Sequence, residues 1–400
     1  MTDTTTAHAH AAHDHHHDQG VGLSAGMTLL LATACGVIVS CLYFAQPLIQ
    51  LIGPELGFPA WTGGFIVTLT QLGYGAGLLL VTPLADVLEN RRLVLVALSC
   101  NVVALALAAV SPTATIFLLA SLLVGLTAVV VQILVPLAAH LAPRAIRGRV
   151  VGNVMSGLLL GILLGRPAAS AVAEAFGWRW VFAASAVGTT VLGLVLARAL
   201  PVRRPSAAHG YGELLSSLWT VWRTMPEVRR RAFYQAALFG TFSLFWTAVP
   251  LLLAQRYGFG QTGIGLFALA GAGGAAAAPI AGRLADHGWA RAATGFGMAA
   301  VLVAFASTGF DLGLIPLALA AVILDAGVQT NLVVSQRAFY SLAPEIRSRL
   351  NSVFFAVFFV GGAIGSTLAS VLFAHSWGAV AALGMALPAI TLVAFLLERR

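Results

Sequence analysis

The sequence predicts an all-α membrane protein in which twelve transmembrane helices form two six-helix bundles of like orientation. Three observations lead to this prediction: the composition, the spacing of the apolar runs and an internal repeat. Of the 400 residues, 59% are hydrophobic and 9% are charged, and the mean hydropathy is +0.91. A soluble domain carries about 25% charged residues. So much apolar surface cannot be buried in the chain's own core, so lipid must be its solvent.

Apolar runs of roughly membrane-spanning length, about 17–25 residues each, recur twelve times. Backbone polar groups in hydrocarbon must bond within their own segment, so we interpret the runs as helices. The alternating strands of a membrane barrel are not visible in the sequence. The predicted spans lie near residues 27–49, 61–83, 93–110, 113–139, 150–173, 178–197, 232–254, 262–282, 292–309, 312–335, 350–373 and 377–396.

The basic residues indicate the orientation of these spans. All 22 are arginines, and with a cytoplasmic amino terminus nineteen of them fall in cytoplasmic loops and tails. Only Arg179 and Arg256 fall on the opposite side, while Arg166 lies within a span. Because short cytoplasmic loops are rich in arginine, both termini are expected in the cytoplasm. The net charge of +8 is therefore a topology signal and not a nucleic-acid-binding surface, and the expected partner is the lipid bilayer.

The chain repeats itself at an offset of 200 residues. Residues 84–86 recur as 284–286, residues 146–149 recur in part as 346–349, and Gly161 and Gly165 recur as Gly361 and Gly365. Parallel repeats of this kind relate two halves about an axis along the membrane normal, with a substrate site between them. The predicted organisation is a tail (1–25), a bundle (26–200), a linker (201–230) and a second bundle (231–400).

The linker contains its own helical pattern. Its apolar side chains recur at helical spacing, which predicts an amphipathic helix on the cytoplasmic membrane surface; a flexible linker is the alternative. The residues that carry this pattern are Leu214, Leu215, Leu218, Trp219 and Trp222.

The span count, the repeat and the long central loop resemble the major facilitator superfamily. By its apolar runs, the resemblance covers the whole chain except the first ~20 residues. That family carries G-x-L-A-D-x-x-G-x-[RK]-[RK] after its second span. The first half has Leu84-Ala85-Asp86 followed by Arg91 without the glycines, and the second has Gly282 to Asp286 followed by Arg291. The resemblance implies a cytoplasmic gate formed by Asp86, Arg91, Asp286 and Arg291. A carboxylate favours arginine and helix amino termini; the alternative is a solvated loop carboxylate.

A finer resemblance is to the bacterial drug and metabolite:proton antiporters, whose fifth span carries G-x-x-x-G-P-x-x-G-G. This chain has Gly161 to Gly165, then Arg166 and Pro167, without the later glycine pair. The antiporters usually have an arginine in the fourth span, where this chain has Ser121. The resemblance implies a monomeric carrier in the inner membrane of a bacterium.

Two charged residues lie well inside predicted spans, which marks each as a candidate functional site. Arg166 lies ~24 Å along the fifth span from its cytoplasmic end, and Asp325 ~20 Å along the tenth from its outer end. We therefore expect the two to differ by ~10 Å in depth, without a direct ion pair. Asp325 is the candidate proton carrier; the alternative is a neutral buried carboxyl bonded to a neighbouring helix. For Arg166 the alternative is a structural tie to helix ends or to Glu174.

In this superfamily the first, fourth, seventh and tenth spans line the cavity. The candidate lining is aromatic and amide, with little charge, which suits an amphipathic neutral or weakly cationic molecule better than a phosphorylated sugar or a dicarboxylate. Ordinary helix packing is the alternative for each aromatic residue. The substrate-binding candidates are Tyr43, Gln46, Gln71, Gln132, Gln235, Phe239, Phe242, Trp246 and Gln329.

The amino-terminal tail is rich in histidine. His13, His15, His16 and His17 are candidate ligands for a transition metal. Export of a divalent metal is therefore an alternative function, although the spans offer a permeating metal few ligands. A tail with incidental metal affinity is the simpler interpretation.

The leading function is secondary active transport by alternating access, with efflux of a small amphipathic organic compound driven by protons. A uniporter or importer of a small metabolite is a further alternative. The chain has no lysine and no phosphate-binding loop of the form G-x-x-x-x-G-K-[ST], which excludes an ATP-driven pump. No Ser–His pair or metal cluster is visible at membrane depth, so an enzyme is not expected, nor is a cofactor.

Overall fold

A computed structural model describes residues 24–143, 145–205, 210–275, 277–310, 313–340 and 346–398. Over these ranges the secondary structure is helical and includes no strand. The histidines at 8–17 lie outside the described residues, as does Arg144.

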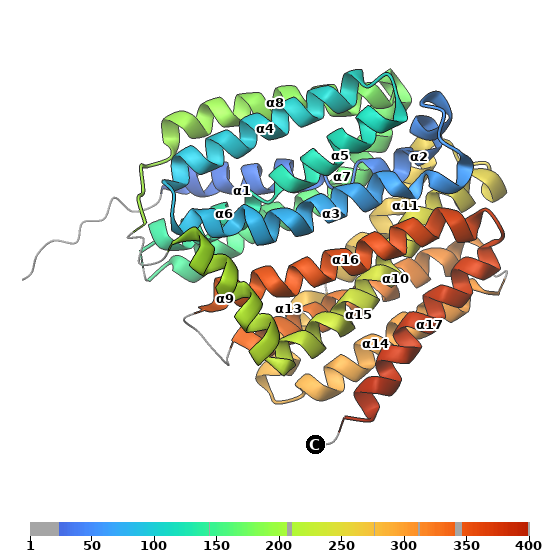
Figure 1. Ribbon diagram of the computed structural model, residues 1–400. Helices are drawn as coiled ribbons and strands as arrows, with labels where there is room; N and C mark the ends of the chain where they lie inside the picture. Colours follow the sequence, from blue (N-terminus) through green and yellow to red (C-terminus); the bar gives the residue numbers. More distant parts are fainter. Residues whose placement is uncertain are drawn as a thin grey trace, which may run out of the picture.

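The described part of the amino-terminal half contains eight α-helices that build its spans, and Figure 1 shows their arrangement. The first predicted span is broken: α1 and α2 meet at an angle of 40°, and Pro47 lies at the start of the second piece. The fourth predicted span is built from α5 and α6. The helices are α1 (Ala25–Ser40), α2 (Ala45–Glu55), α3 (Gly64–Leu80), α4 (Asn90–Val110), α5 (Ala114–Ala128), α6 (Val131–Leu141), α7 (Arg147–Phe176) and α8 (Trp178–Ala199), with short 3-10 helices at Ala60–Thr62 and Thr82–Asp86.

The carboxy-terminal half follows a linker helix and has one heavily broken region. The predicted eighth span, 262–282, is a series of short helices rather than one long helix. The helices are α9 (Tyr211–Thr224), α10 (Pro226–Tyr257), α11 (Gln261–Ala268), α12 (Ala272–Ala275), α13 (Ala277–Asp286), α14 (Ala290–Thr308), α15 (Leu314–Tyr340), α16 (Arg347–Phe373) and α17 (Trp377–Leu396), with a 3-10 turn at Leu269–Gly271.

Length and hydropathy identify ten membrane-spanning helices in the described part of the chain, or eleven when α1 and α2 count as one span. The protein is thus an all-α, multi-pass membrane protein. The predicted eighth span is the one that this criterion does not recognise, because none of its pieces is long enough to cross a bilayer. The total of twelve remains a prediction.

The repeated glycines make corresponding contacts in the two halves. A Cβ at Gly161 of α7 would lie 2.1 Å from the carbonyl oxygen of Gly36 in α1. A Cβ at Gly361 of α16 would lie 2.1 Å from the carbonyl oxygen of Ala236 in α10. Small residues allow helix backbones to approach closely. The glycines that repeat at an offset of 200 residues therefore make the same helix contact in each half.

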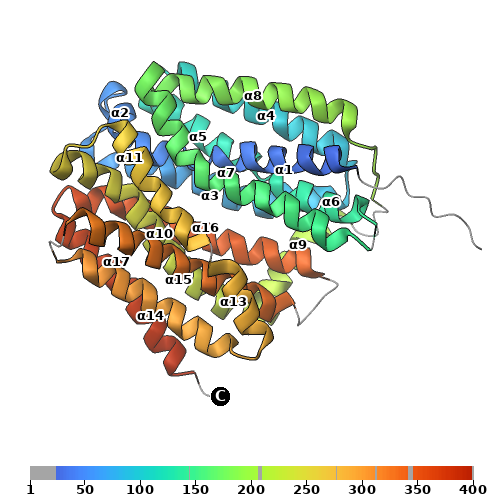
Figure 2. The same cartoon turned by 180° about the vertical axis from the view of Figure 1, so that it is seen from behind.

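The two halves meet along α3 and α16 and along α7 and α11, and both pairs are seen side by side in Figures 1 and 2. Thr68 of α3 forms hydrogen bonds with Ser366 at 3.0 Å and with Thr367 at 2.8 Å, both in α16. A Cβ at Gly64 would lie 2.1 Å from the carbonyl oxygen of Ser366, so the backbones touch there. The halves are therefore held by small and hydroxyl side chains.

The linker helix forms as predicted, from Tyr211 to Thr224. Its buried face, Leu214, Leu218 and Val221, packs largely against helices of the protein, mainly α16 and α10, while Trp219 is 61% exposed. Figure 1 shows α9 crossing the ends of helices from both halves. The apolar face of the helix therefore packs against protein, and its membrane-surface location stays a prediction.

Candidate functional site

The centre of the site is Arg166, buried where the two halves meet. It lies in α7 and is 4% exposed. Its Nε donates a hydrogen bond of 2.7 Å to Oε1 of Gln46 in α2. Its guanidinium carbon lies 4.8 Å from the ring centroid of Tyr43, 5.4 Å from that of Phe242 and 4.7 Å from that of Trp246. A cation over aromatic faces is stabilised by the ring quadrupoles, so these three rings form an aromatic cage for the arginine.

The cage also connects Arg166 to the deep carboxylate. Nε1 of Trp246 donates a hydrogen bond of 2.9 Å to Oδ1 of Asp325 in α15. One indole therefore contacts the cation on its face and the anion at its edge. Arg166 comes from the amino-terminal half, whereas Trp246 and Asp325 come from the other half, so this unit joins the two halves.

The positions of the two charges can also be counted from the adjoining ends of the observed helices. Arg166 is ten residues from Phe176, the last residue of α7, and Asp325 is eleven residues from Leu314, the first of α15. At 1.5 Å per residue, both lie about 15–17 Å from those helix ends. The difference of ~10 Å in depth stays a prediction. No direct ion pair forms between these two described side chains; Trp246 bridges them.

A break in the helices makes room for Asp325. A Cβ added at Gly271 would lie 2.7 Å from Oδ2 of Asp325. A Cβ added at Gly274 would lie 2.2 Å from Cβ of Asp325. Glycines at the broken region between α11 and α13 therefore let the backbone pack directly against the carboxyl side chain. Asp325 is half-buried, and the predicted alternative partner of Arg166, Glu174, forms no contact with it in the described structure.

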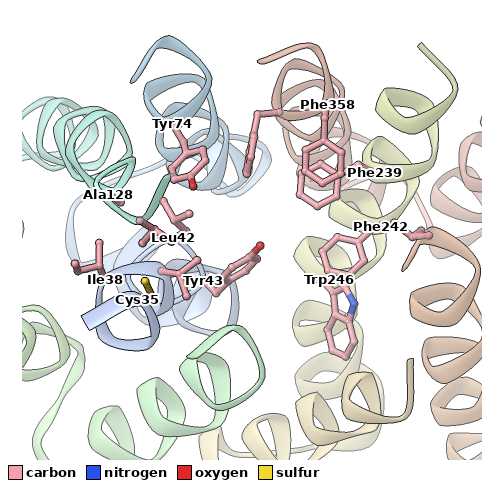
Figure 3. Close-up of a cluster of buried hydrophobic side chains, with 14 of the residues drawn as sticks. Cys35, Ile38, Leu42, Tyr43, Tyr74, Ala128, Phe239, Phe242, Trp246 and Phe358 are labelled. Carbon is pink, nitrogen blue, oxygen red and sulfur yellow. The ribbon is translucent and has the colours of Figure 1, made fainter. Parts of the chain in front are cut away.

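A second aromatic group lies beside the cage (Figure 3). Phe239 of α10 stacks on Phe358 of α16 with ring centroids 3.7 Å apart. Tyr74 of α3 contacts Phe359 of α16 at 4.5 Å, across the two halves. Of these four residues, Phe239 was predicted from the sequence, whereas Tyr74, Phe358 and Phe359 were not. The closely spaced phenylalanines at 354, 355, 358 and 359 were the available signal, although aromatic residues at helical spacing are also common in ordinary cores.

Three of the predicted amide side chains form hydrogen bonds away from Arg166. Gln71 donates a 3.0 Å hydrogen bond to Ser243 across the two halves. Gln132 donates to the Tyr74 hydroxyl at 3.1 Å within the amino-terminal half. Gln235 accepts a hydrogen bond of 2.6 Å from Asn331, and both residues lie in the carboxy-terminal half. Only Gln46 reaches Arg166.

The remaining candidate, Gln329, lies one helical turn beyond Asp325 on α15 and is half-buried. No hydrogen bond links it to the cage residues in the described part of the chain. It therefore shares a helix face with Asp325 but is not a part of the cage.

The predicted gate residues fall into two groups. Asp286 forms an ion pair with Arg337 of α15, inside the carboxy-terminal half. Asp86 lies near enough to Arg349 of α16, across the halves, and to Arg203 before the linker helix for both charges to act on it. Of the four gate candidates, Asp86 is therefore the one near a charge of the opposite half.

The two gate arginines instead bind helix carboxyl ends in their own halves. Arg91, at the start of α4, donates to the carbonyl of Ala197 near the end of α8. Arg291, at the start of α14, donates to the carbonyl of Phe395 near the end of α17 at 3.4 Å and forms an ion pair of 3.8 Å with Glu398. Because a cation near a helix carboxyl end stabilises it, these arginines act as caps.

We expect Arg91→Ala and Arg291→Ala each to lower the thermal stability of the purified protein by about 0.5–1 kcal/mol while transport continues. Each substitution removes a hydrogen bond to the carboxyl end of a helix in the same half, and neither removes a contact between the two halves. Thermal unfolding and flux measured on the same preparations check this. Full loss of flux at unchanged stability would instead assign the arginines to the gate.

The described residues contain no group of three or more His, Cys, Asp or Glu side chains that could hold a metal ion. The predicted ligands His13, His15, His16 and His17 lie outside the described residues.

Comparisons with known proteins give a consistent result. The family model described as Major Facilitator Superfamily matches residues 28–328 and 236–400. The chain is 37% identical to the uncharacterized transporter YgaY of Escherichia coli O157:H7 over 374 residues, covering 93% of this chain and 95% of that protein. It is 35% identical to the probable transporter SCO4007 of Streptomyces coelicolor, covering 90% of this chain and 85% of the relative.

Solved structures show the same fold. A POT family transporter in complex with 5-aminolevulinic acid superposes with a TM-score of 0.73 at 12% identity, covering 93% of this chain and 94% of that chain. The human organic anion transporter MFSD10 superposes with a TM-score of 0.64 at 16% identity, covering 93% and 99%. At these identities the likeness concerns the fold alone.

Proposed function

Because this chain belongs to the Major Facilitator Superfamily and is a membrane transporter rather than an enzyme, we propose that it exports a small amphipathic organic compound in exchange for protons. The proposed cycle is alternating access, in which the two halves rock about the central site. The observation that carries this proposal is the unit of Arg166, Trp246 and Asp325, a buried cation and a deep carboxyl that join the two halves through one indole.

Asp325 is the proposed proton carrier. A buried arginine is tolerated only when its charge is balanced, and the carboxylate beyond Trp246 is the nearby anion in the described site. Protonation of Asp325 would remove that balance and weaken the connection between the halves. The proton would thereby favour one arrangement of the halves, which is what coupling requires.

The proposed substrate is neutral or weakly cationic, because the lining combines aromatic rings and amides. Tyr43, Phe242 and Trp246 supply the aromatic rings, which surround Arg166. Gln71 and Gln132 supply the amides, which bond to Ser243 and Tyr74. In the proposed exchange with protons, the substrate leaves a bacterial cell across its inner membrane. The arginine distribution favours both termini in the cytoplasm.

The test is flux through the purified protein in liposomes carrying a pH gradient. We expect neutral and monocationic aromatic compounds to accumulate against their gradient on the acidic side, and a protonophore to stop this, because the proton gradient supplies the energy. A divalent metal and a set of monocarboxylates serve as comparison substrates. Downhill flux that ignores the pH gradient would indicate a uniporter, and accumulation on the alkaline side would indicate symport.

A further inference from the structure

A long groove runs along the surface of the amino-terminal half, between α1, α7 and α8. Its volume is about 1020 Å³, and its lining is mostly aliphatic and glycine. No residue of the aromatic cage or Asp325 lines it, so it is separate from the central site. Figure 2 shows α1, α7 and α8 on the same side of the molecule.

The lining becomes polar at one end. Arg149, Asn153 and Ser156 lie along the first turns of α7 and line the groove. Arg149 and Asn153 are four residues apart and so share a helix face, and both are exposed. Neither forms an ion pair or a hydrogen bond with another side chain in the described part of the chain. Arg149 is the single charged residue among the lining residues, and no acidic residue is among them.

We propose that this groove binds an anionic phospholipid. The phosphate would contact Arg149 and Asn153, and an acyl chain would lie along the apolar part, towards Gly188 in α8. Apolar contact alone does not select a lipid, because the surrounding chains are equally apolar. Selection therefore rests on the charge complementarity between Arg149 and the headgroup. A basic residue near an anionic lipid surface supplies about a fivefold preference.

The charge is tested by native mass spectrometry of the full-length protein with phosphatidylglycerol and phosphatidylcholine. We expect the wild type to retain phosphatidylglycerol preferentially and Arg149→Gln to lose about fivefold of that preference. The matched control is Arg147→Gln, which removes the same charge at the same helix end from an exposed residue that does not line the groove. An equal loss in both variants would indicate a general surface charge effect and overturn the proposal.

The groove itself is tested by filling it. A Cβ at Gly188 would meet open space, and Gly188 lines the groove, so Gly188→Leu should fold and occupy the place of the acyl chain. Gly193 of the same helix also faces open space but does not line the groove. We expect Gly188→Leu to reduce retention of phosphatidylglycerol and Gly193→Leu to leave it unchanged. Undiminished retention in Gly188→Leu would contradict the assignment. Neither assay measures transport, so its outcome is independent of the proposed function.

Discussion

Replacing Asp325 by asparagine is expected to reduce proton-driven accumulation of substrate to the level of liposomes without protein. Asparagine has the same shape and its Oδ1 can still accept the bond from Nε1 of Trp246, but it cannot carry a proton at neutral pH. Substrate exchange at equal pH on both sides should remain, because exchange does not require the carboxyl to be unloaded. Both fluxes are measured on one preparation, with thermal unfolding as a check on the fold.

The matched control is Glu174→Gln, which removes another carboxylate, one that is exposed near the outer end of α7. Its proton-driven accumulation should equal that of the wild type. Uphill transport that persists in Asp325→Asn would assign the proton to another group. Loss of exchange together with uphill transport would show that Asp325 is needed for substrate binding or for the movement itself.

Replacing Gly161 by alanine is expected to destabilise the protein, although alanine favours helices over glycine by roughly 1 kcal/mol. The added Cβ would lie 2.1 Å from the carbonyl oxygen of Gly36, which forces α1 and α7 apart. Overpacking of this kind costs about 1–3 kcal/mol. Gly361→Ala should have the same effect, because its Cβ would lie 2.1 Å from the carbonyl oxygen of Ala236.

The control for both is Gly152→Ala in α7, where a Cβ meets nothing within 4 Å. There the helix preference acts alone, so thermal unfolding should occur at a slightly higher temperature than in the wild type. Opposite signs at positions 152 and 161 would establish close backbone packing as the cause. If Gly161→Ala were as stable as Gly152→Ala, α1 and α7 would not be in contact at this glycine.

The candidate site was predictable in its residue types more than in its arrangement. Arg166 and Asp325 stood out in the sequence because charges within apolar runs are costly. Their connection did not, because it runs through the side chain of Trp246 rather than through a direct ion pair. The bridging role of Trp246 depends on the direction of its N–H bond, which helix periodicity does not fix.

The gate illustrates the same difference. The repeated motif identified Asp86, Arg91, Asp286 and Arg291 as a set, yet the structure gives them different partners. Asp86 lies near charges of both halves, Arg349 and Arg203, whereas both arginines bind helix ends within their own halves. A charged loop residue can reach several partners, and the sequence does not say which of them lies nearest.

By itself, the sequence determined that this is a multi-pass helical membrane protein of the transporter class. Hydropathy and charge placement are local properties of the sequence, and in lipid the backbone polar groups of a segment bond within a helix. The tertiary structure alone decided which distant residues meet: Arg166 with Gln46 and the aromatic cage, and Asp325 with Trp246. The reason is geometric. Contacts between helices depend on their length, rotation and breaks, which arise only when all the helices pack together.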